Sequence, residues 1–309
     1  MRVIDIEDII QSMQNETKFV LRCEEIYHDK ISAASAAILR EHGKKPFVAL
    51  TGPSGSGKTT SALRLKDYLE NLGCKVILIG MDNFFYSDKE APPEAEGNWE
   101  SPYYVNREKL QETLFALSEG KTVDVPVFDY TKNDVGSWNR VEGSTEAIII
   151  AEGIHMLNPL LLDPIRDKTT GIYVAPRTRL ITPDEQLVRP EMVRVARRMI
   201  RDYRGRGKSL QSTVLRARQV DDGEQQYIQP YKTNAAVHID SFHDYELCVL
   251  SRYIREIDSF RDELTEEFME QNGLGVLLKV VKELPPLTID YIPRDSLIRE
   301  FIGGSKYSY

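Results

Sequence analysis

Cysteines are few in this sequence and long apolar runs are missing, and both absences exclude classes of protein. Only three of the 309 residues are cysteine (Cys23, Cys74 and Cys248), and no two of them form a CxxC pair. This usage argues against a disulfide scaffold or a cysteine metal site, and it predicts a reduced, cytoplasmic protein. The longest apolar stretch, 147–151, is far shorter than the roughly 20 residues of a membrane helix. The N-terminal residues alternate apolar and acidic side chains, unlike a signal peptide.

Positive charge is also in deficit. The sequence has 40 Lys and Arg residues against 48 Asp and Glu residues, which gives a formal net charge of -8. We therefore expect no nucleic-acid partner that is bound through overall positive charge. Hydrophobic residues make up 41% and charged residues 28%, which is ordinary for a globular protein with a buried core.

The hydrophobic pattern predicts an α/β protein. A buried strand over 47–50, a glycine-rich turn, a helix over 59–71 and a second strand over 75–79 follow one another. This order predicts parallel strands joined by a right-handed crossover. Further strands are expected at 123–127 (weak), 147–151, 172–174 and 237–239, with helices at 107–119, 190–203 and 209–219 and a mostly helical region from 245 onward.

The glycine-rich turn fits the phosphate-loop pattern G-x-x-x-x-G-K-[ST]. Its residues are Gly52, Pro53, Ser54, Gly55, Ser56, Gly57, Lys58 and Thr59, followed by Thr60. Glycines let successive N–H groups point at phosphates, and the N-terminus of the helix adds its positive dipole end. Lys58 is expected to reach the β- and γ-phosphates of ATP, and the Thr59 hydroxyl to ligate Mg²⁺.

Two acids follow neighbouring strands of the predicted sheet. Glu152 follows the stretch 147–151, and Asp82 follows the strand over 75–79. Because the carboxyl ends of such strands meet at the phosphate crevice, Glu152 is expected to hold Mg²⁺ or to orient the nucleophile. Asp82 is expected to accept the proton of an attacking hydroxyl. A solvated carboxylate for Glu152 and a turn residue for Asp82 are the alternatives. Together with Thr59 they form the candidate metal set.

Basic residues gather in one stretch of this acidic chain, namely Arg194, Arg197, Arg198, Arg201, Arg204, Arg206 and Lys208. Guanidinium groups bind phosphate oxygens bidentately and neutralise charge on a transferred group. For Arg201 and Arg206 we predict a lid, at about 190–210, that closes over ATP and excludes water. We interpret Arg194 and Arg204 as part of a basic helix face that is exposed to solvent.

One motif points to another class of protein and is rejected. Thr131-Lys132-Asn133-Asp134 resembles the guanine-reading [NT]-K-x-D of P-loop GTPases. In those proteins a D-x-x-G motif precedes it, whereas the D-x-x-G of this chain, 202–205, follows it. No LSGGQ-like segment is present, which argues against a subunit of an ATP-driven transporter.

Beyond single motifs, the chain resembles the uridine kinase and phosphoribulokinase group of P-loop kinases, and more closely the bacterial uridine kinase-like nucleoside kinases. The matching stretches are GPSGSGKTT, MDNFFY, IIIAEGIHMLNP, IYVAPRTRL, RRMIRDYRGRG, GEQQYIQPYKTNAAVHIDSFHDYEL and LIREFIGGS. RRMIRDYRGRG and EGIHMLNP are specific, whereas the phosphate loop alone is not. The resemblance covers most of the chain from about residue 45.

This resemblance implies transfer of the γ-phosphate of ATP to the 5′-hydroxyl of a pyrimidine nucleoside. Asp82 matches the catalytic aspartate of that group, and Glu100 matches an acid that binds the ribose hydroxyls. The basic residues that it assigns are Arg198 at the nucleoside, Arg201 and Arg206 at the phosphates, and Lys208 where the group carries another Arg.

The base-contacting segment departs from the pattern of the group. The sequence over 126–133 reads PVFDYTKN, so that Phe128 replaces a Tyr and Asn133 replaces a His. Phe128 can stack on a base but cannot hydrogen-bond to one, and Asn133 is either a base-reading residue or a turn residue. The phosphoryl-transfer residues match while the base-reading residues do not.

The sequence thus predicts an α/β P-loop NTPase fold of the mononucleotide kinase type, with a five-stranded parallel sheet, flanking helices and a helical lid. We expect a core over 46–245, an N-terminal helical segment over 1–45 and a C-terminal helical extension over 246–309. These appendages are expected to pack on the core or on a second subunit of a homo-oligomer. Transfer to another small alcohol, such as a sugar phosphate or a pantothenate-like molecule, and a non-catalytic ATP-binding regulatory module are the alternatives.

Overall fold

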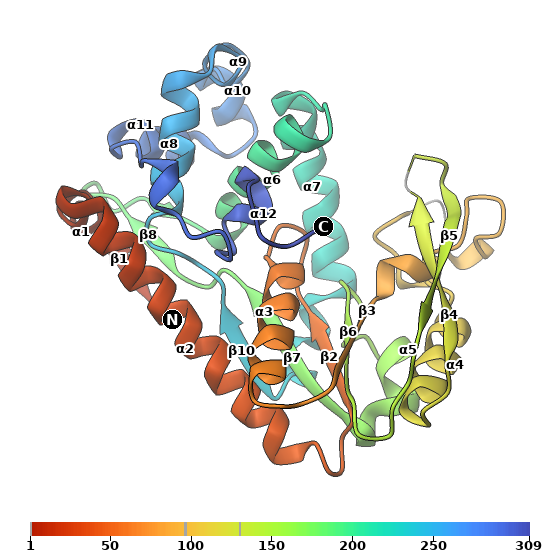
Figure 1. The fold of residues 1–309 in the computed structure, drawn as a ribbon. Coiled ribbons are helices and arrows are strands. Elements are labelled where there is room, and N and C mark those ends of the chain that lie inside the picture. Colours follow the sequence, from red (N-terminus) through yellow and green to blue (C-terminus); the bar gives the residue numbers. More distant parts are fainter. Residues whose placement is uncertain (1, 96–97, 130) are drawn as a thin grey trace.

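A five-stranded parallel sheet forms the centre of the molecule (Figure 1). The computed structural model describes residues 2–95, 98–129 and 131–309. In sheet order, the strands are β10 (Val237–Asp240), β7 (Thr169–Ala175), β2 (Phe47–Thr51), β6 (Ile148–Glu152) and β3 (Val76–Gly80). The predicted parallel α/β fold is confirmed.

Helices cover both faces of the sheet, which explains why its strands read as continuous apolar runs. Val48 and Leu50 point into one core, whereas Phe47 and Ala49 point into the other. The first core lies under α2 (Glu16–Glu41), α3 (Lys58–Asn71), α6 (Pro190–Gly205) and α8 (Glu246–Glu256). The second lies under α4 (Arg107–Ser118) and α5 (Pro159–Leu162).

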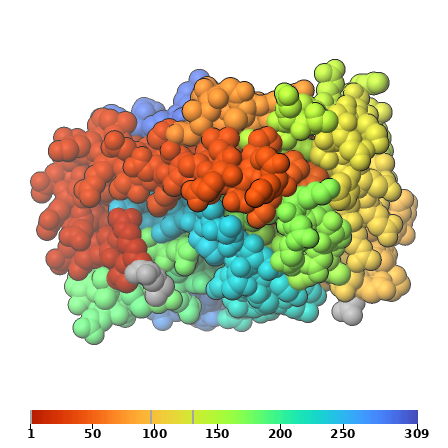
Figure 2. All heavy atoms as spheres, turned by 90° about the horizontal axis from the view of Figure 1, so that it is seen from below, coloured from red at the N-terminus to blue at the C-terminus, as the bar shows by residue number. Residues whose placement is uncertain are grey.

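The N-terminal residues are part of this packing. After β1 (Val3–Asp5) and α1 (Ile6–Ser12), the long helix α2 lies along α3, where the Tyr27 and Ser61 hydroxyls are 2.6 Å apart. Figure 2 shows the N-terminal segment as a band across one face of the molecule. A small second sheet joins β1 to β8 (Arg179–Ile181) and β9 (Leu187–Val188). It was not predicted, because its strands are too short to show a period.

A β-hairpin stands apart from the main sheet, on the side of α4 (Figure 1). Its antiparallel strands are β4 (Val123–Asp129) and β5 (Asp134–Val141). The weak strand expected at 123–127 corresponds to β4. The second strand was missed because its residues are mostly exposed and polar and give no apolar alternation.

The remaining elements are helical. The hairpin of α6 and α7 (Leu210–Tyr227) leads to β10 and then to a group of short helices: α9 (Asp258–Glu263), α10 (Glu266–Gln271), α11 (Gly275–Glu283) and α12 (Arg299–Ile302). In the described part of the chain, no helix combines the length and apolar character needed to cross a bilayer. The C-terminus lies beside the start of α3 (Figure 1).

Candidate active site

The loop over 52–59 joins β2 to α3 and forms the floor of the candidate site. Gly55 and Gly57 have φ angles of 77° and 81°, a left-handed conformation that favours glycine. A Cβ atom on Gly52 would lie 2.0 Å from the carbonyl oxygen of Val174, so this position has no room for a side chain. The loop therefore takes a tight path that leads into the N-terminus of α3, where the N–H groups of the first turn favour an anion.

Three arginines of α6 hold this loop from outside. Arg198 Nη1 donates to the carbonyl oxygen of Ser54 at 3.1 Å, and Arg194 Nη1 donates to the same atom at 3.3 Å. Arg197 Nη1 donates to the carbonyl oxygens of Gly55 and Ser56, each at 3.1 Å. Cations of α6 therefore engage three successive carbonyl groups of the loop and fix its path.

The interpretation of Arg194 as part of a solvated face is wrong. Its side chain is 2% exposed and forms ion pairs with Glu224 and Asp221 of α7. Helical spacing identifies a polar face, but it cannot tell a face turned to solvent from one that meets a buried acid on another helix. Arg204 is exposed, as expected, and donates to the Tyr253 hydroxyl.

Arg198 has an unused donor that is buried at the loop. The residue is 4% exposed, and its Nη2 has no hydrogen-bond partner among the described residues. Burial, with the neighbouring charge of Arg194, lowers the pKa of Arg198 to about 10, so the guanidinium remains charged at neutral pH. A buried cation with a free donor calls for an anion, and phosphate oxygens match its geometry.

The two predicted strand-end acids meet beside the loop. Gly80 of β3 pairs with Glu152 of β6, and Asp82 lies two residues beyond that pair in a 3₁₀ turn over Met81–Phe84. Thr59 Oγ1 donates to Glu152 Oε1 at 3.1 Å. Burial raises the pKa of Glu152 to about 7, the charge of Lys58 opposes this rise, and the charge of Asp82 adds to it.

The oxygen atoms of this group suit a hard divalent cation. Asp82 Oδ1 and Glu152 Oε2 are both buried and lack hydrogen-bond partners in the described part of the chain. A hydroxyl and two carboxylates beside a phosphate loop are donors that Mg²⁺ prefers, with the remaining positions filled by water and phosphate. Thr59, Asp82 and Glu152 therefore fit the predicted cation.

Glu100 reaches the same region from the loop between β3 and α4. Burial raises the pKa of Glu100, while the charges of Lys58 and Arg198 lower it. A Cβ atom on Gly223 of α7 would lie 2.5 Å from Glu100 Cβ, so the helix packs directly against this residue. No local pattern in the sequence indicates that a glycine in α7 makes room for a candidate substrate-binding acid.

Phe128 and Asn133 lie in different surroundings. Phe128 is 6% exposed and packs edge-to-face against Phe85 and Trp99, with ring centroids 6.0 and 6.3 Å away. Its N–H donates to Asn83 Oδ1 at 3.2 Å, which ties β4 to the turn that carries Asp82. Asn133 lies between β4 and β5 with a φ angle of 54°, a conformation typical of a turn asparagine.

The expected lid residues lie at the end of α6 and in the following turn. Arg201 Nε donates to Asp202 Oδ1 at 2.9 Å, and Arg206 Nη1 lies 3.6 Å from the same oxygen. Lys208 lies just before α7, and burial with the charge of Arg216 lowers its pKa. Asp202 is thus the carboxylate around which the two predicted lid arginines gather.

Two residues near the site were not found from the sequence. His155 is 1% exposed, and neither ring nitrogen has a hydrogen-bond partner among the described residues. Burial lowers the pKa of His155 to about 3, so the ring is neutral. Glu300 accepts hydrogen bonds from Thr60. His155 comes three residues after β6, and this position alone is only weak evidence for a site residue. The contact between Glu300 and Thr60 spans 240 residues of sequence, so no local pattern could have predicted it.

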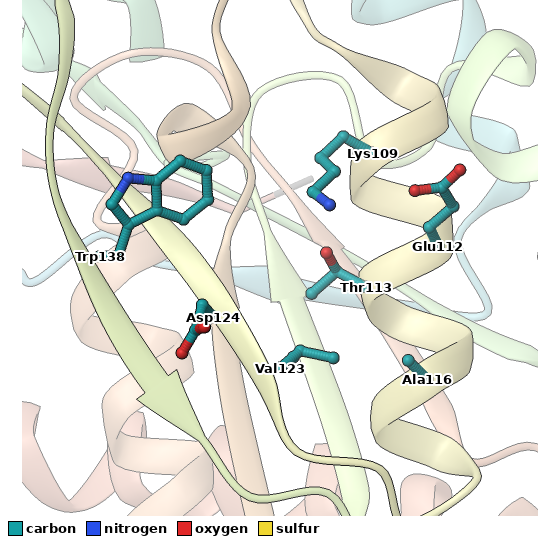
Figure 3. A pocket seen from close by; sticks show the side chains of 7 residues that line it. All are labelled: Lys109, Glu112, Thr113, Ala116, Val123, Asp124 and Trp138. Atoms are coloured by element: carbon teal, nitrogen blue, oxygen red, sulfur yellow. The ribbon is translucent and has the colours of Figure 1, made fainter.

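A separate cavity of about 820 Å³ lies away from the phosphate loop (Figure 3). Lys109 and Thr113 of α4 form one wall, and Asp124 and Trp138 of the β4–β5 hairpin form the other. No residue of the phosphate loop lines it. We therefore do not assign chemistry to this cavity.

A phosphate loop between a central parallel strand and a helix, with acids on the two neighbouring strands, defines a P-loop phosphotransferase. The model of the phosphoribulokinase/uridine kinase family matches residues 47–247. The chain belongs to this family of kinases, and the resemblance to it is confirmed.

Relatives and solved structures agree with this assignment. The chain is 31% identical to a uridine kinase of Staphylococcus haemolyticus over 197 residues, which is 62% of this chain and 86% of that protein. It is 30% identical to a uridine kinase of Ligilactobacillus salivarius over 198 residues, 63% of this chain and 84% of that protein. A proposed fructose transport system kinase from Silicibacter sp. TM1040 shares the fold, with a TM-score of 0.52, 22% identity and coverage of 67% and 98%.

Proposed function

We propose that this kinase transfers the γ-phosphate of ATP to the 5′-hydroxyl of a pyrimidine nucleoside. The observation that carries the proposal is the meeting of three acids with the phosphate loop. Thr59 is hydrogen-bonded to Glu152, and Asp82 has a buried oxygen without a hydrogen-bond partner among the described residues. The charge of Lys58 acts on Glu152 and on Glu100. This set has a place for the donor phosphates and a base for the acceptor hydroxyl.

In this proposal the triphosphate lies along the N–H groups of the loop and the first turn of α3. Lys58 contacts the β- and γ-phosphates, and Arg198 Nη2, which has no partner in the described part of the chain, donates to phosphate or acceptor oxygens. Thr59, Asp82 and Glu152 would hold Mg²⁺, which neutralises charge on the phosphate oxygens. Exclusion of water by the surrounding helices strengthens each of these contacts.

Asp82 has the role of general base. The 5′-oxygen of the acceptor forms a bond to the γ-phosphorus, its proton passes to Asp82, and the bond from the γ-phosphorus to the β-phosphate oxygen breaks to release ADP. Arg201 and Arg206 leave Asp202 and move onto the phosphates when the lid closes. The buried thiols of Cys23 and Cys248 are consistent with a cytoplasmic location for this reaction.

The acceptor is held by Glu100 and by the aromatic residues of its loop. Glu100 accepts hydrogen bonds from two ribose hydroxyls, and the cluster of Phe85, Trp99 and Phe128 forms the wall next to the base. The matched proteins of Staphylococcus and Ligilactobacillus that are named uridine kinases support this choice of acceptor.

A second candidate is the same transfer to another small alcohol. The observation that favours it is that Phe128 is packed among aromatic rings and carries no hydrogen-bonding group toward a base. A sugar phosphate or a pantothenate-like acceptor needs hydroxyl recognition by Glu100 but no reading of a base.

Acceptor-dependent release of ADP separates these candidates. The purified protein is incubated with ATP and Mg²⁺ together with uridine, cytidine, a sugar phosphate or pantothenate, and a Lys58→Ala variant serves as the control for contaminating kinases. We expect release with uridine or cytidine. Release of ADP only with a non-nucleoside would support kinase activity but contradict the proposal that the acceptor is a nucleoside. ATP binding without release for any acceptor would favour a regulatory module.

A further inference from the structure

The C-terminal strap, which we define as residues 297–309, lies on the phosphate loop and the first turn of α3. Figure 1 shows the C-terminus beside the N-terminal end of this helix. The methyl groups of Leu297 pack on Gly57, where an added Cβ atom would lie 2.4 Å from Leu297 Cδ1. The strap is fixed further along α3 by Asp67, which pairs with Lys306 and accepts from the Tyr307 hydroxyl, both at 2.8 Å.

Two side chains of the strap are hydrogen-bonded to Thr60, the residue directly after the phosphate-loop motif. Glu300 Oε2 accepts from Thr60 Oγ1 at 2.6 Å and from the Thr60 N–H at 3.3 Å. The Tyr309 hydroxyl lies 2.9 Å from the same Oγ1. Gly303 and Gly304, with φ angles of 77° and 72°, turn the chain so that both groups reach one hydroxyl.

The carboxylate of Glu300 lies at the N-terminus of α3, a position that stabilises an anion. Thr60 is in the first turn of α3, whose N–H groups and dipole attract negative charge. In a phosphate loop these first-turn groups receive the α- and β-phosphates of the donor. A carboxylate and a phosphate cannot share the same N–H and hydroxyl, because both are acceptors and both carry negative charge.

The charge of Glu300 also reaches the rest of the site. Thr60, which Glu300 binds, directly follows Thr59, whose Oγ1 donates to Glu152 Oε1 at 3.1 Å. Glu300 is therefore close enough to affect groups that are expected to face the triphosphate. It adds a further negative charge to a site that already holds the carboxylates of Asp82, Glu100 and Glu152.

We propose that Glu300 is a tethered competitor of the donor nucleotide: it occupies the α-phosphate position at Thr60 and must leave when ATP binds. The inference rests on the proposed function only in taking the loop over 52–60 as the donor site. Because Glu300 lies before the two glycines, its side chain leaves by rotating on α12, and the residues after Gly304 move separately. The cost of this displacement lowers the affinity for the donor, so Glu300 sets the nucleotide concentration at which the enzyme works.

The test is direct nucleotide binding by the full chain, measured by calorimetry with ADP and Mg²⁺. Glu300→Gln keeps the shape but removes the charge, and Glu283→Gln, an exposed residue of α11, removes an equal charge elsewhere. We expect Glu300→Gln to bind ADP about tenfold more tightly, because a neutral amide competes less well than a carboxylate for the N–H and hydroxyl of Thr60, and we expect Glu283→Gln to match the wild type.

An unchanged or weaker affinity in a folded Glu300→Gln protein would overturn the inference and leave the proposed function standing. Binding of ADP by neither protein would overturn the proposed function and the inference with it. Hydrogen exchange on the wild type gives a second readout that needs no variant. Addition of ADP and Mg²⁺ should increase exchange over residues 300–309, whereas protection of these residues would show that the strap forms part of the nucleotide site.

Discussion

Lys58 and Asp82 both act electrostatically on the other two acids of the site. The positive charge of Lys58 lowers the pKa of Glu100 and of Glu152, while burial and the charge of Asp82 raise them. With burial dominating, both carboxyl groups are easier to protonate than usual. A site with this excess of acids over cations is stabilised when a proton, a metal ion or an acceptor hydroxyl arrives.

Among single residues, substitution of Glu100 tests the proposed acceptor site most directly. Glu100→Ala removes an acceptor for two hydroxyl groups but leaves the phosphate loop intact. We expect the KM for the acceptor to rise about 10- to 100-fold, as for loss of a hydrogen bond to a charged group, while the dissociation constant for ADP stays the same. Steady-state kinetics and calorimetry measure the two quantities. Glu108→Ala on the exposed side of α4 is the control, and equal KM values for both variants would remove Glu100 from the acceptor site.

At the scale of elements, α6 connects the phosphate loop with the proposed lid. Its first arginines, Arg194, Arg197 and Arg198, bond to carbonyl groups of the loop. Its last turn carries Arg201, which is bonded to Asp202. The N-terminal half of α6 is therefore held by the donor site, while its last turn carries the arginine that is expected to move.

Arg201 and Arg204 form a matched pair on this helix. Arg201→Ala removes a cation that we expect on the phosphates during transfer, and kcat should fall at least about tenfold. Arg204→Ala removes an exposed cation of the same helix, and kcat should change by no more than about twofold. If single-turnover rates of the two variants are equal, α6 does not supply a lid residue at this position.

Elements with strong local signals were predictable from the sequence. The order of strand, glycine-rich loop and helix, and the apolar run 147–151, predicted the central sheet and the meeting of Asp82 with Glu152. The contacts of Arg194 and Glu300 were not predictable, because each depends on an acid or a hydroxyl far along the chain. Short or exposed strands, such as β8 and β5, were missed because their side chains follow no apolar period.

At the scale of the whole molecule, both ends of the chain pack behind the phosphate loop. Glu24 of α2 forms a buried ion pair with Arg64 of α3 at 3.1 Å and accepts from the Tyr245 hydroxyl at 2.7 Å. The Tyr245 hydroxyl also lies 3.0 Å from Ser296 Oγ, just before the strap. His243 completes this group, with its Nε2 3.4 Å from Glu24 Oε1. Residues before 45 and after 290 thus share one buried network with α3.

His243 makes this network sensitive to acid. Burial lowers the pKa of His243 from 6.5 to about 4 in the folded protein, with Glu24 opposing and Arg197 adding to the shift. Between these values the unfolded chain binds a proton that the folded protein does not, so stability is present above pH 6.5 and is lost as the pH falls toward 4. The loss is on the order of 3 kcal/mol at about 1.4 kcal/mol per pKa unit.

Urea unfolding from pH 7 to pH 4 measures this contribution. His243→Gln cannot titrate, and the difference in unfolding free energy between wild type and variant should shrink as the pH falls. His28, which lies in α2 and is exposed, gives the matched variant His28→Gln. A difference between wild type and His243→Gln that stays constant over the whole range would mean that His243 does not titrate differently on folding.

The central claim is that Asp82 accepts the proton of an acceptor hydroxyl as the γ-phosphate of ATP is transferred to that hydroxyl. ATP labelled in its γ-phosphate is incubated with Mg²⁺ and uridine or cytidine, and the label is followed by mass spectrometry in the wild type and in Asp82→Asn. The account predicts label on the nucleoside 5′-position in the wild type and a rate about 10²- to 10⁴-fold lower in the variant, with the affinity for ADP in the absence of Mg²⁺ retained. Equal rates in the two proteins, or label found only as inorganic phosphate, would contradict it.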